Sequence, residues 1–145
     1  MTAAGGTTSY TATMSYGSGS TYATSDVKSV VDAWSAARFT NQLETVDGYS
    51  ARLLKYEEFP NLGYENKFSC TGWCYYSGSL ANVPSWVYNS NYWYWTMSPN
   101  NDSSSDVWYV SNDNGSLDSR HVNIIHEGAV RPVINVYKSA IQSQS

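Results

Sequence analysis

The residues of this chain that could bind a metal or undergo redox chemistry are two cysteines and two histidines. Three residues separate Cys70 from Cys74, and four separate His121 from His126. These are zinc-finger ligand types, but a finger has about 12 to 15 residues between its two pairs, and the interval here is far longer. We therefore expect no metal site and no cofactor. A local disulfide between the cysteines is expected, with a free thiol pair as the alternative.

Glu57 and Glu58 come nearest to a pair of catalytic carboxylates. Adjacent residues on one helical turn cannot both face one substrate, as the two carboxylates of a glycosidase must. An ion pair with Arg52 or Arg131, or a favourable place in the first turn of a helix, explains them instead. The sequence has no nucleophile elbow, phosphate loop or metalloprotease motif. No catalytic residue is assigned, and an enzyme stays only an alternative.

The segment 100–128 carries side chains suited to recognition. It is rich in Asn, Asp, Ser, Tyr, Trp, Arg and His, which offer hydrogen bonds and stacking surfaces at low entropic cost. Trp108 and Tyr109 should point to opposite faces of their strand, so only one can contact a ligand. Tyr109 is preferred because a tyrosine is exposed at lower cost. The predicted ligand-binding residues are Asn101, Asp102, Trp108, Tyr109, Asn112, Asp113, Asp118, Arg120, His121, Asn123 and His126. A merely solvated loop surface is the alternative.

Composition narrows the possible partners. Charged residues make up 14% of the chain against an average of about 25%, and the net charge is -4. Such a polar but weakly charged surface is typical of extracellular β-rich modules. The eight basic residues are never adjacent, so we expect no nucleic-acid partner. No apolar run approaches the roughly 18 residues of a membrane span, and no signal peptide opens the chain, so membrane insertion is not expected and any export signal has been removed.

The elements that position these side chains follow from local patterns. Residues 1–24 form either a linker or a first pair of strands. Ser25 can cap a helix over 26–39, whose buried face consists of Val27, Val30, Val31 and Trp34. A second, short helix is predicted over 55–59, because Pro60 stops it.

Strands and turns fill the rest. A turn at Asp47-Gly48 precedes a strand over 49–54, and 63–85 reads as a long loop. From Tyr92 the residues alternate, which places Trp93, Trp95 and Met97 in the core and displays Tyr92, Tyr94 and Thr96. Asn114-Gly115 predicts a two-residue hairpin turn after a strand over 107–111. The last strand, 130–137, contains Pro132, which indicates a sheet edge or a bulge.

The order of three motifs resembles bacterial and phage surface domains with a C-type lectin-like fold. They are Ala51-Arg52-Leu53-Leu54 leading into Glu57-Glu58-Phe59, Tyr-Trp-Tyr-Trp-Thr-Met-Ser-Pro at 92–99, and Val-Arg-Pro-Val-Ile-Asn at 130–135. The resemblance is to the branch that includes formylglycine-generating-enzyme-like domains and the variable proteins of diversity-generating retroelements, among them gut-bacterial surface and pilin-like modules. It implies an α+β fold with two helices, small antiparallel sheets and a long loop-rich segment. The domain would span 25–141, between residues 1–24 and a polar tail, 142–145.

Two activities of these relatives are not inherited. The sequence lacks the Glu-Pro-Asn or Gln-Pro-Asp motif of calcium-dependent sugar binding, and it has no cysteine after Cys74 for formylglycine generation. The function implied is an extracellular or cell-surface domain for adhesion or receptor recognition. Its ligand would be an unknown protein or glycan on a cell or phage-host surface. A structural module of a surface or pilin-like protein is the alternative.

Overall fold

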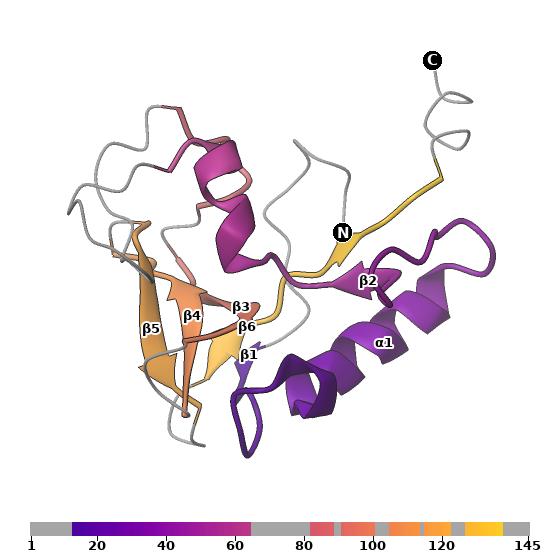
Figure 1. The fold of residues 1–145 in the computed structure, drawn as a ribbon, viewed down its shortest axis with the longest axis horizontal. Coiled ribbons are helices and arrows are strands. Elements are labelled where there is room, and N and C mark those ends of the chain that lie inside the picture. Colours follow the sequence, from indigo (N-terminus) through magenta and orange to yellow (C-terminus); the bar gives the residue numbers. More distant parts are fainter. Residues whose placement is uncertain are drawn as a thin grey trace.

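The computed structural model describes residues 13–64, 82–88, 91–100, 105–113, 115–122 and 127–137. One sheet contains five strands in the order β1-β6-β3-β4-β5, and a second pairs β2 with β7. β3 runs parallel to β6, and all other neighbouring strands are antiparallel. In Figure 1 the larger sheet lies on one side of the molecule, and α1 and β2 lie on the other. The strands are β1 (Thr13–Met14), β2 (Ala51–Arg52), β3 (Tyr94–Pro99), β4 (Asp106–Val110), β5 (Leu117–His121), β6 (Gly128–Ala129) and β7 (Val133–Ile134), and the helical elements are η1 (Tyr22–Thr24), α1 (Asp26–Arg38), η2 (Tyr56–Glu58) and η3 (Pro60–Leu62).

The first predicted helix is confirmed. α1 spans Asp26–Arg38, and Ser25 caps it by accepting a hydrogen bond from the Lys28 N–H at 3.0 Å. Val27 and Val31 are fully buried, as the apolar spacing predicts. None of the helices in the described part of the chain has the length and apolar character needed to cross a bilayer.

The second predicted helix is wrong, and the predicted fold class is wrong with it. The segment 55–59 forms only a 3₁₀ turn, η2, and Pro60 begins another, η3. The stretch before Pro60 is too short for an α-helix, and the Glu58 carboxylate accepts from the Lys55 N–H at 2.8 Å, which closes the turn locally. The described residues form a mostly β fold with one α-helix and a five-stranded mixed sheet, in place of an α+β fold with two helices and small antiparallel sheets.

The Asp47-Gly48 turn is confirmed. Val46 and Tyr49 exchange two backbone hydrogen bonds around it, at 2.9 and 3.0 Å. Asp47 and Gly48 have φ angles of 53° and 87°, the positive values that a type I′ turn requires. The strand that follows, β2, is shorter than predicted and pairs with β7, which begins directly after Pro132.

Both faces of β3 are buried. The prediction that the tryptophan face lies in the core is confirmed for Trp95, and the prediction that the other face is displayed is wrong for Tyr94 and Thr96. Trp95 is fully buried and packs edge-on against Tyr16, with 5.2 Å between ring centroids. Tyr94 and Thr96, expected on display, are also buried, in contact with a second core cluster or with β4. Trp93 is only partly buried. A core on each side of the sheet hides both sets of alternating residues.

The hairpin between β4 and β5 is present, but its connection is longer than predicted. The Ser111 N–H donates to the Ser116 carbonyl at 2.8 Å, so four residues lie between the paired serines. Gly115 has a φ of 70° and donates to the Ser111 carbonyl at 3.0 Å. The glycine therefore supplies the left-handed conformation that closes this turn.

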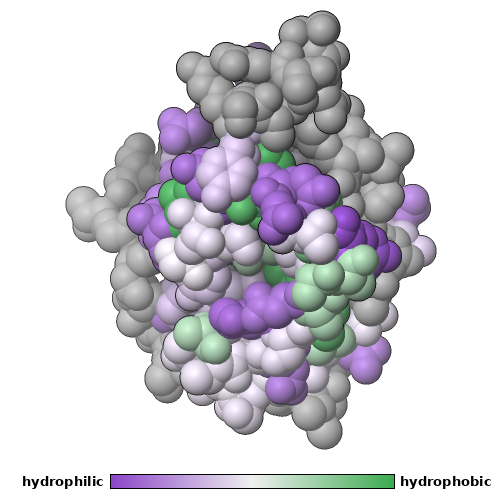
Figure 2. All heavy atoms as spheres, turned by 90° about the vertical axis from the view of Figure 1, so that its right-hand side faces the viewer, coloured by the Kyte–Doolittle hydropathy of each residue, from purple (hydrophilic) through white to green (hydrophobic). Residues whose placement is uncertain are grey.

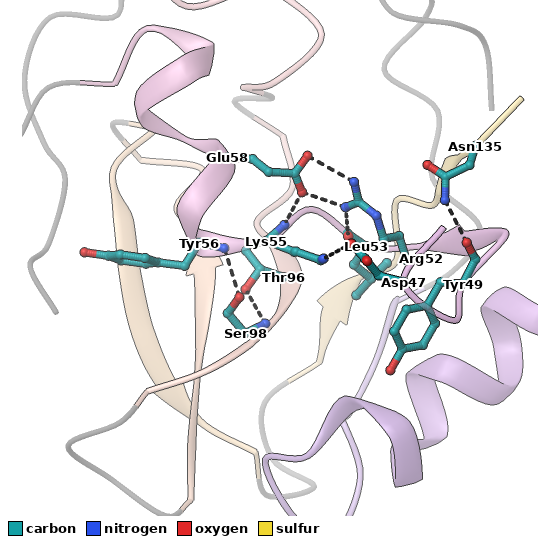
Figure 3. A network of polar contacts seen from close by, with 10 residues as sticks. All are labelled: Asp47, Tyr49, Arg52, Leu53, Lys55, Tyr56, Glu58, Thr96, Ser98 and Asn135. Carbon is teal, nitrogen blue, oxygen red and sulfur yellow. Dashed lines mark hydrogen bonds and ion pairs between the residues drawn. The ribbon is translucent and has the colours of Figure 1, made fainter. Parts of the chain in front are cut away.

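A polar network joins β2 and η2 to β3 (Figure 3). Arg52 donates two hydrogen bonds to the Glu58 carboxylate, at 2.6 and 3.1 Å, which confirms one of the predicted ion pairs. The Tyr56 N–H donates to the Ser98 hydroxyl at 2.9 Å. The bidentate pair fixes the course of the chain between the two sheets.

Buried tyrosines make the fold sensitive to alkali. Burial is the main cause that raises the pKa of Tyr16, Tyr22, Tyr64 and Tyr94. In the unfolded chain they lose their protons near pH 10. Above that pH the unfolded state binds fewer protons than the folded state, so the free energy of unfolding falls as pH rises.

We therefore expect stability to be insensitive to these tyrosines below about pH 10 and to fall steeply above it. Tyrosinate absorbance and near-ultraviolet circular dichroism, followed together against pH, should show the buried tyrosines ionising only as tertiary structure is lost. Ionisation of all thirteen tyrosines with the tertiary signal intact would contradict the expectation.

Candidate functional site

The register of β4 and β5 divides the predicted ligand-binding residues between two faces. Tyr109 pairs with Asp118, and paired residues project to the same side. Arg120, two residues along β5, shares that side. Trp108 and His121 project to the other face. The structure thus brings Tyr109, Asp118 and Arg120 together and separates them from Trp108 and His121.

Other predicted positions lie elsewhere or outside the described residues. Asn112 and Asp113 belong to the connection between β4 and β5, where the Asn112 carbonyl accepts from the Tyr88 hydroxyl at 3.0 Å and Asp113 is exposed. The disulfide and part of the ligand-binding set stay predictions, because their residues fall outside the described ranges: Cys70, Cys74, Asn101, Asp102, Asn123 and His126.

Arg120 lies against two aromatic rings. Its guanidinium carbon is 4.9 Å from the ring centroid of Trp93 and 4.9 Å from that of Tyr109. The two rings are themselves in edge contact, with centroids 5.1 Å apart. Contacts of this kind contribute roughly 0.5 to 2 kcal/mol each, depending on desolvation. The rings therefore hold the guanidinium in place without requiring a carboxylate.

Among the described residues, no carboxylate forms an ion pair with Arg120. The ion pairs found there are Lys28–Asp32, Arg52–Glu58 and Lys55–Asp47. Arg120 is only partly buried, so its charge can be reached from solvent. We define the Arg120 site as Trp93, Tyr109, Asp118 and Arg120.

Tyr109 was expected to be the exposed aromatic of its strand, and this is wrong. It is only 8% exposed, and Trp108 is fully buried against Tyr56. The reason is again that both faces of the sheet are covered. Burial raises the pKa of Tyr109, the charge of Asp118 raises it further, and Arg120 opposes them. The Tyr109 ring therefore supports Arg120, and its hydroxyl lies within the electrostatic reach of both charged side chains.

Trp93 belongs to this site, although the sequence assigned it to the core. It lies just before β3, and its carbonyl accepts a hydrogen bond from the Ala129 N–H of β6 at 2.9 Å. Strand alternation places it on the same face as Trp95, but only the pairing of β3 with β4 brings that face beside Tyr109. The local pattern contains no signal for that pairing.

Asp118 occupies an outward-pointing backbone donor of β5, which has β4 as its single neighbouring strand in the described part of the chain. β5 is therefore an edge strand within the described residues. Two hydrogen bonds, from the Val122 N–H to the Ser105 carbonyl and from the Ser111 N–H to the Ser116 carbonyl, determine which backbone groups of β5 point towards β4. In this alternation the Ser119 N–H points outward. It donates to Asp118 Oδ1 at 2.7 Å. A carboxylate at an exposed edge discourages pairing with another strand.

Arg131, the alternative ion-pair partner predicted for the two glutamates, bonds to backbone carbonyls instead of a carboxylate. It donates to the carbonyls of Trp86 and Val87 and lies 4.6 Å from the centroid of Tyr94. It therefore fastens the segment 82–88 to the sheet. In the described part of the chain, no group of three or more potential ligands could hold a metal ion.

The side of the molecule that carries α1 and β2 offers less for recognition. Figure 2 views the side that carries α1 and β2, and its coloured residues show only small hydrophobic areas among hydrophilic ones. The large hydrophobic side chains exposed in the described ranges are single residues, Val46, Tyr92 and Tyr137. Scattered residues of this kind are normal on a soluble domain and do not indicate a docking surface.

Comparison with known families gives one match. A family model described as "Domain of unknown function (DUF6273)" matches residues 32–138. Neither the curated proteins nor the solved structures include a significant match. All four residues of the Arg120 site lie inside the matched range.

The packing of Trp93 can be tested at Gly128. A Cβ at this position would approach Trp93 Cη2 and Trp95 Nε1 to 2.8 Å each. Gly128→Ala should therefore destabilise the fold by about 1 to 3 kcal/mol, the usual cost of overpacking. Urea denaturation measures the change.

Gly19→Ala is the matched control, because a Cβ at Gly19 has nothing within 4 Å. Its effect should stay within about 0.5 kcal/mol. Equal stability of the two variants would show that β6 does not pack closely beneath Trp93.

Proposed function

The chain belongs to the DUF6273 family, a domain family of unknown function, and we propose from the geometry of the Arg120 site that it is a non-enzymatic ligand-recognition domain. The ligand is a protein or glycan, bound on the face of the sheet that carries Tyr109, Asp118 and Arg120. The domain acts at the cell surface or outside the cell. The low charged fraction of 14% supports that location.

The observation that carries the proposal is the position of Arg120. A guanidinium held 4.9 Å from each of two ring centroids has lost much of its conformational freedom before any ligand arrives. A free arginine side chain loses about 2 kcal/mol of rotamer entropy when it is fixed. Because the rings already restrict Arg120, a ligand that binds it pays less of that cost.

The other three arginines differ from Arg120. Arg52 is neutralised by a carboxylate, and Arg131 donates to backbone carbonyls. Arg38 lies over one ring, that of Trp34, and donates to the carbonyl of the same residue at 3.3 Å. Within the described residues, Arg120 alone contacts two aromatic rings with no ion-pair partner. Arginine and aromatic side chains are also the residues enriched at binding hot spots.

Substitution of Arg120 tests the proposal once an array of glycans and proteins has given a ligand. Arg120→Ala should weaken binding at least about thirtyfold, the effect of a hot spot worth 2 kcal/mol. The affinity is measured by titration calorimetry. The melting temperature should fall by only a few degrees, because the two ring contacts of a partly exposed guanidinium contribute near the lower end of about 0.5 to 2 kcal/mol each.

Arg38→Ala is the matched control, because it also removes an arginine that lies over a tryptophan, but from α1. Its affinity should equal that of the wild type. If Arg38→Ala weakened binding and Arg120→Ala did not, the ligand would bind near the end of α1 and the proposed site would be wrong.

A further inference from the structure

We infer that the group bound at Arg120 is the carboxylate of an acidic sugar, an inference that rests on the proposed function. The ligand is a glycan with uronic or sialic acid units. Arg120 would bind the carboxylate, Asp118 would accept hydrogen bonds from sugar hydroxyls, and the partly exposed Trp93 would provide apolar contact. Three features favour this ligand: the geometry of the guanidinium, the charge around it and the edge of β5.

The guanidinium is in contact with the rings but keeps most of its donors. The ring contacts at 4.9 Å depend on the positive charge of the guanidinium. They do not occupy its five N–H donors, which lie in the guanidinium plane. The Tyr109 hydroxyl is close enough to take one of them. The remaining donors form a planar fork, and a carboxylate matches such a fork with two parallel hydrogen bonds.

The surrounding charge favours an anion of single charge. Asp118 projects to the same face as Arg120, two residues away on β5, and the whole chain carries a net charge of -4. A phosphate dianion doubles its attraction to Arg120 and also its repulsion from Asp118 and from the net charge of -4, yet one guanidinium offers it no more hydrogen bonds than it offers a carboxylate. The attraction to Arg120 is the only nearby compensation in the described residues.

The edge of β5 argues against an extended acidic peptide. Such a peptide would gain affinity by adding a strand beside β5, which within the described residues pairs only with β4. At Ser119 the outward N–H is already bonded to Asp118 Oδ1, so a peptide strand would have to displace that carboxylate. A peptide with several acidic residues would also bring more negative charge towards Asp118.

An acidic sugar fits the same features. Its carboxylate is a single charge, and the neighbouring hydroxyls are donors for the acceptor capacity that Asp118 retains beyond its bond to Ser119. The two protein groups lie on one face at positions two apart in β5. The arrangement therefore matches a ligand that presents a carboxylate and hydroxyls side by side.

The test compares glycans with and without their carboxylates. Oligosaccharides that contain glucuronic, galacturonic or sialic acid are titrated into the full chain, and each is paired with the same oligosaccharide whose carboxyl groups are reduced to alcohols. We expect at least one acidic form to bind the wild type, and its reduced form to bind at least tenfold more weakly. Arg120→Ala should lose the preference for the acid, and Arg38→Ala should keep it.

The outcomes separate this inference from the proposed function. Binding that depends on Arg120 but is equal for acidic and reduced glycans, or is specific for an acidic peptide or a phosphorylated sugar, overturns the inference and leaves the recognition role intact. Absence of binding to every acidic glycan also overturns it. Ligand binding unaffected by Arg120→Ala overturns the proposed function and the inference together.

Discussion

The structure depends on the burial of both faces of β3. Trp95 fills one core cluster and Tyr94 the other, and both are essentially inaccessible to water. A strand buried on both sides must satisfy its polar groups internally. Thr96 does so by donating to the Trp108 carbonyl at 2.8 Å, and the Ser98 hydroxyl accepts from Tyr56. Each neighbouring element is placed by a contact with this strand.

Aromatic residues allow this core to form hydrogen bonds as well as apolar contacts, which aliphatic residues could not do. Their rings supply the buried apolar area, and the hydroxyls of some of the tyrosines reach backbone carbonyls in other segments. Tyr64 donates to Gly115 at 2.6 Å, Tyr88 to Asn112 at 3.0 Å, and Tyr94 to Val87. The connection between β4 and β5 and the segment 82–88 are thus tied to the core from inside. The same rings that stabilise the fold restrict the loops around the sheet.

The arginines show how one residue type takes different roles according to what surrounds it. Arg52 meets Glu58 and becomes a structural ion pair between two elements. Arg131 meets backbone carbonyls and holds a loop. Among the described residues, Arg120 meets two rings and the Tyr109 hydroxyl but no carboxylate, and its charge stays available. The proposed recognition site therefore lies where the aromatic core extends to the sheet surface.

The sequence alone determined the features whose causes lie within a few residues. Ser25 and the valine spacing determined α1, and the positive φ preference of Asp47-Gly48 determined its turn. The tertiary structure decided which strands are neighbours, and hence that Tyr109 is buried and Trp93 lies beside Arg120. It also placed β3 parallel to β6, with both of its faces covered. These features depend on contacts between residues far apart in the chain, and no local periodicity records them, because alternation reports only that two faces differ and not what covers each of them.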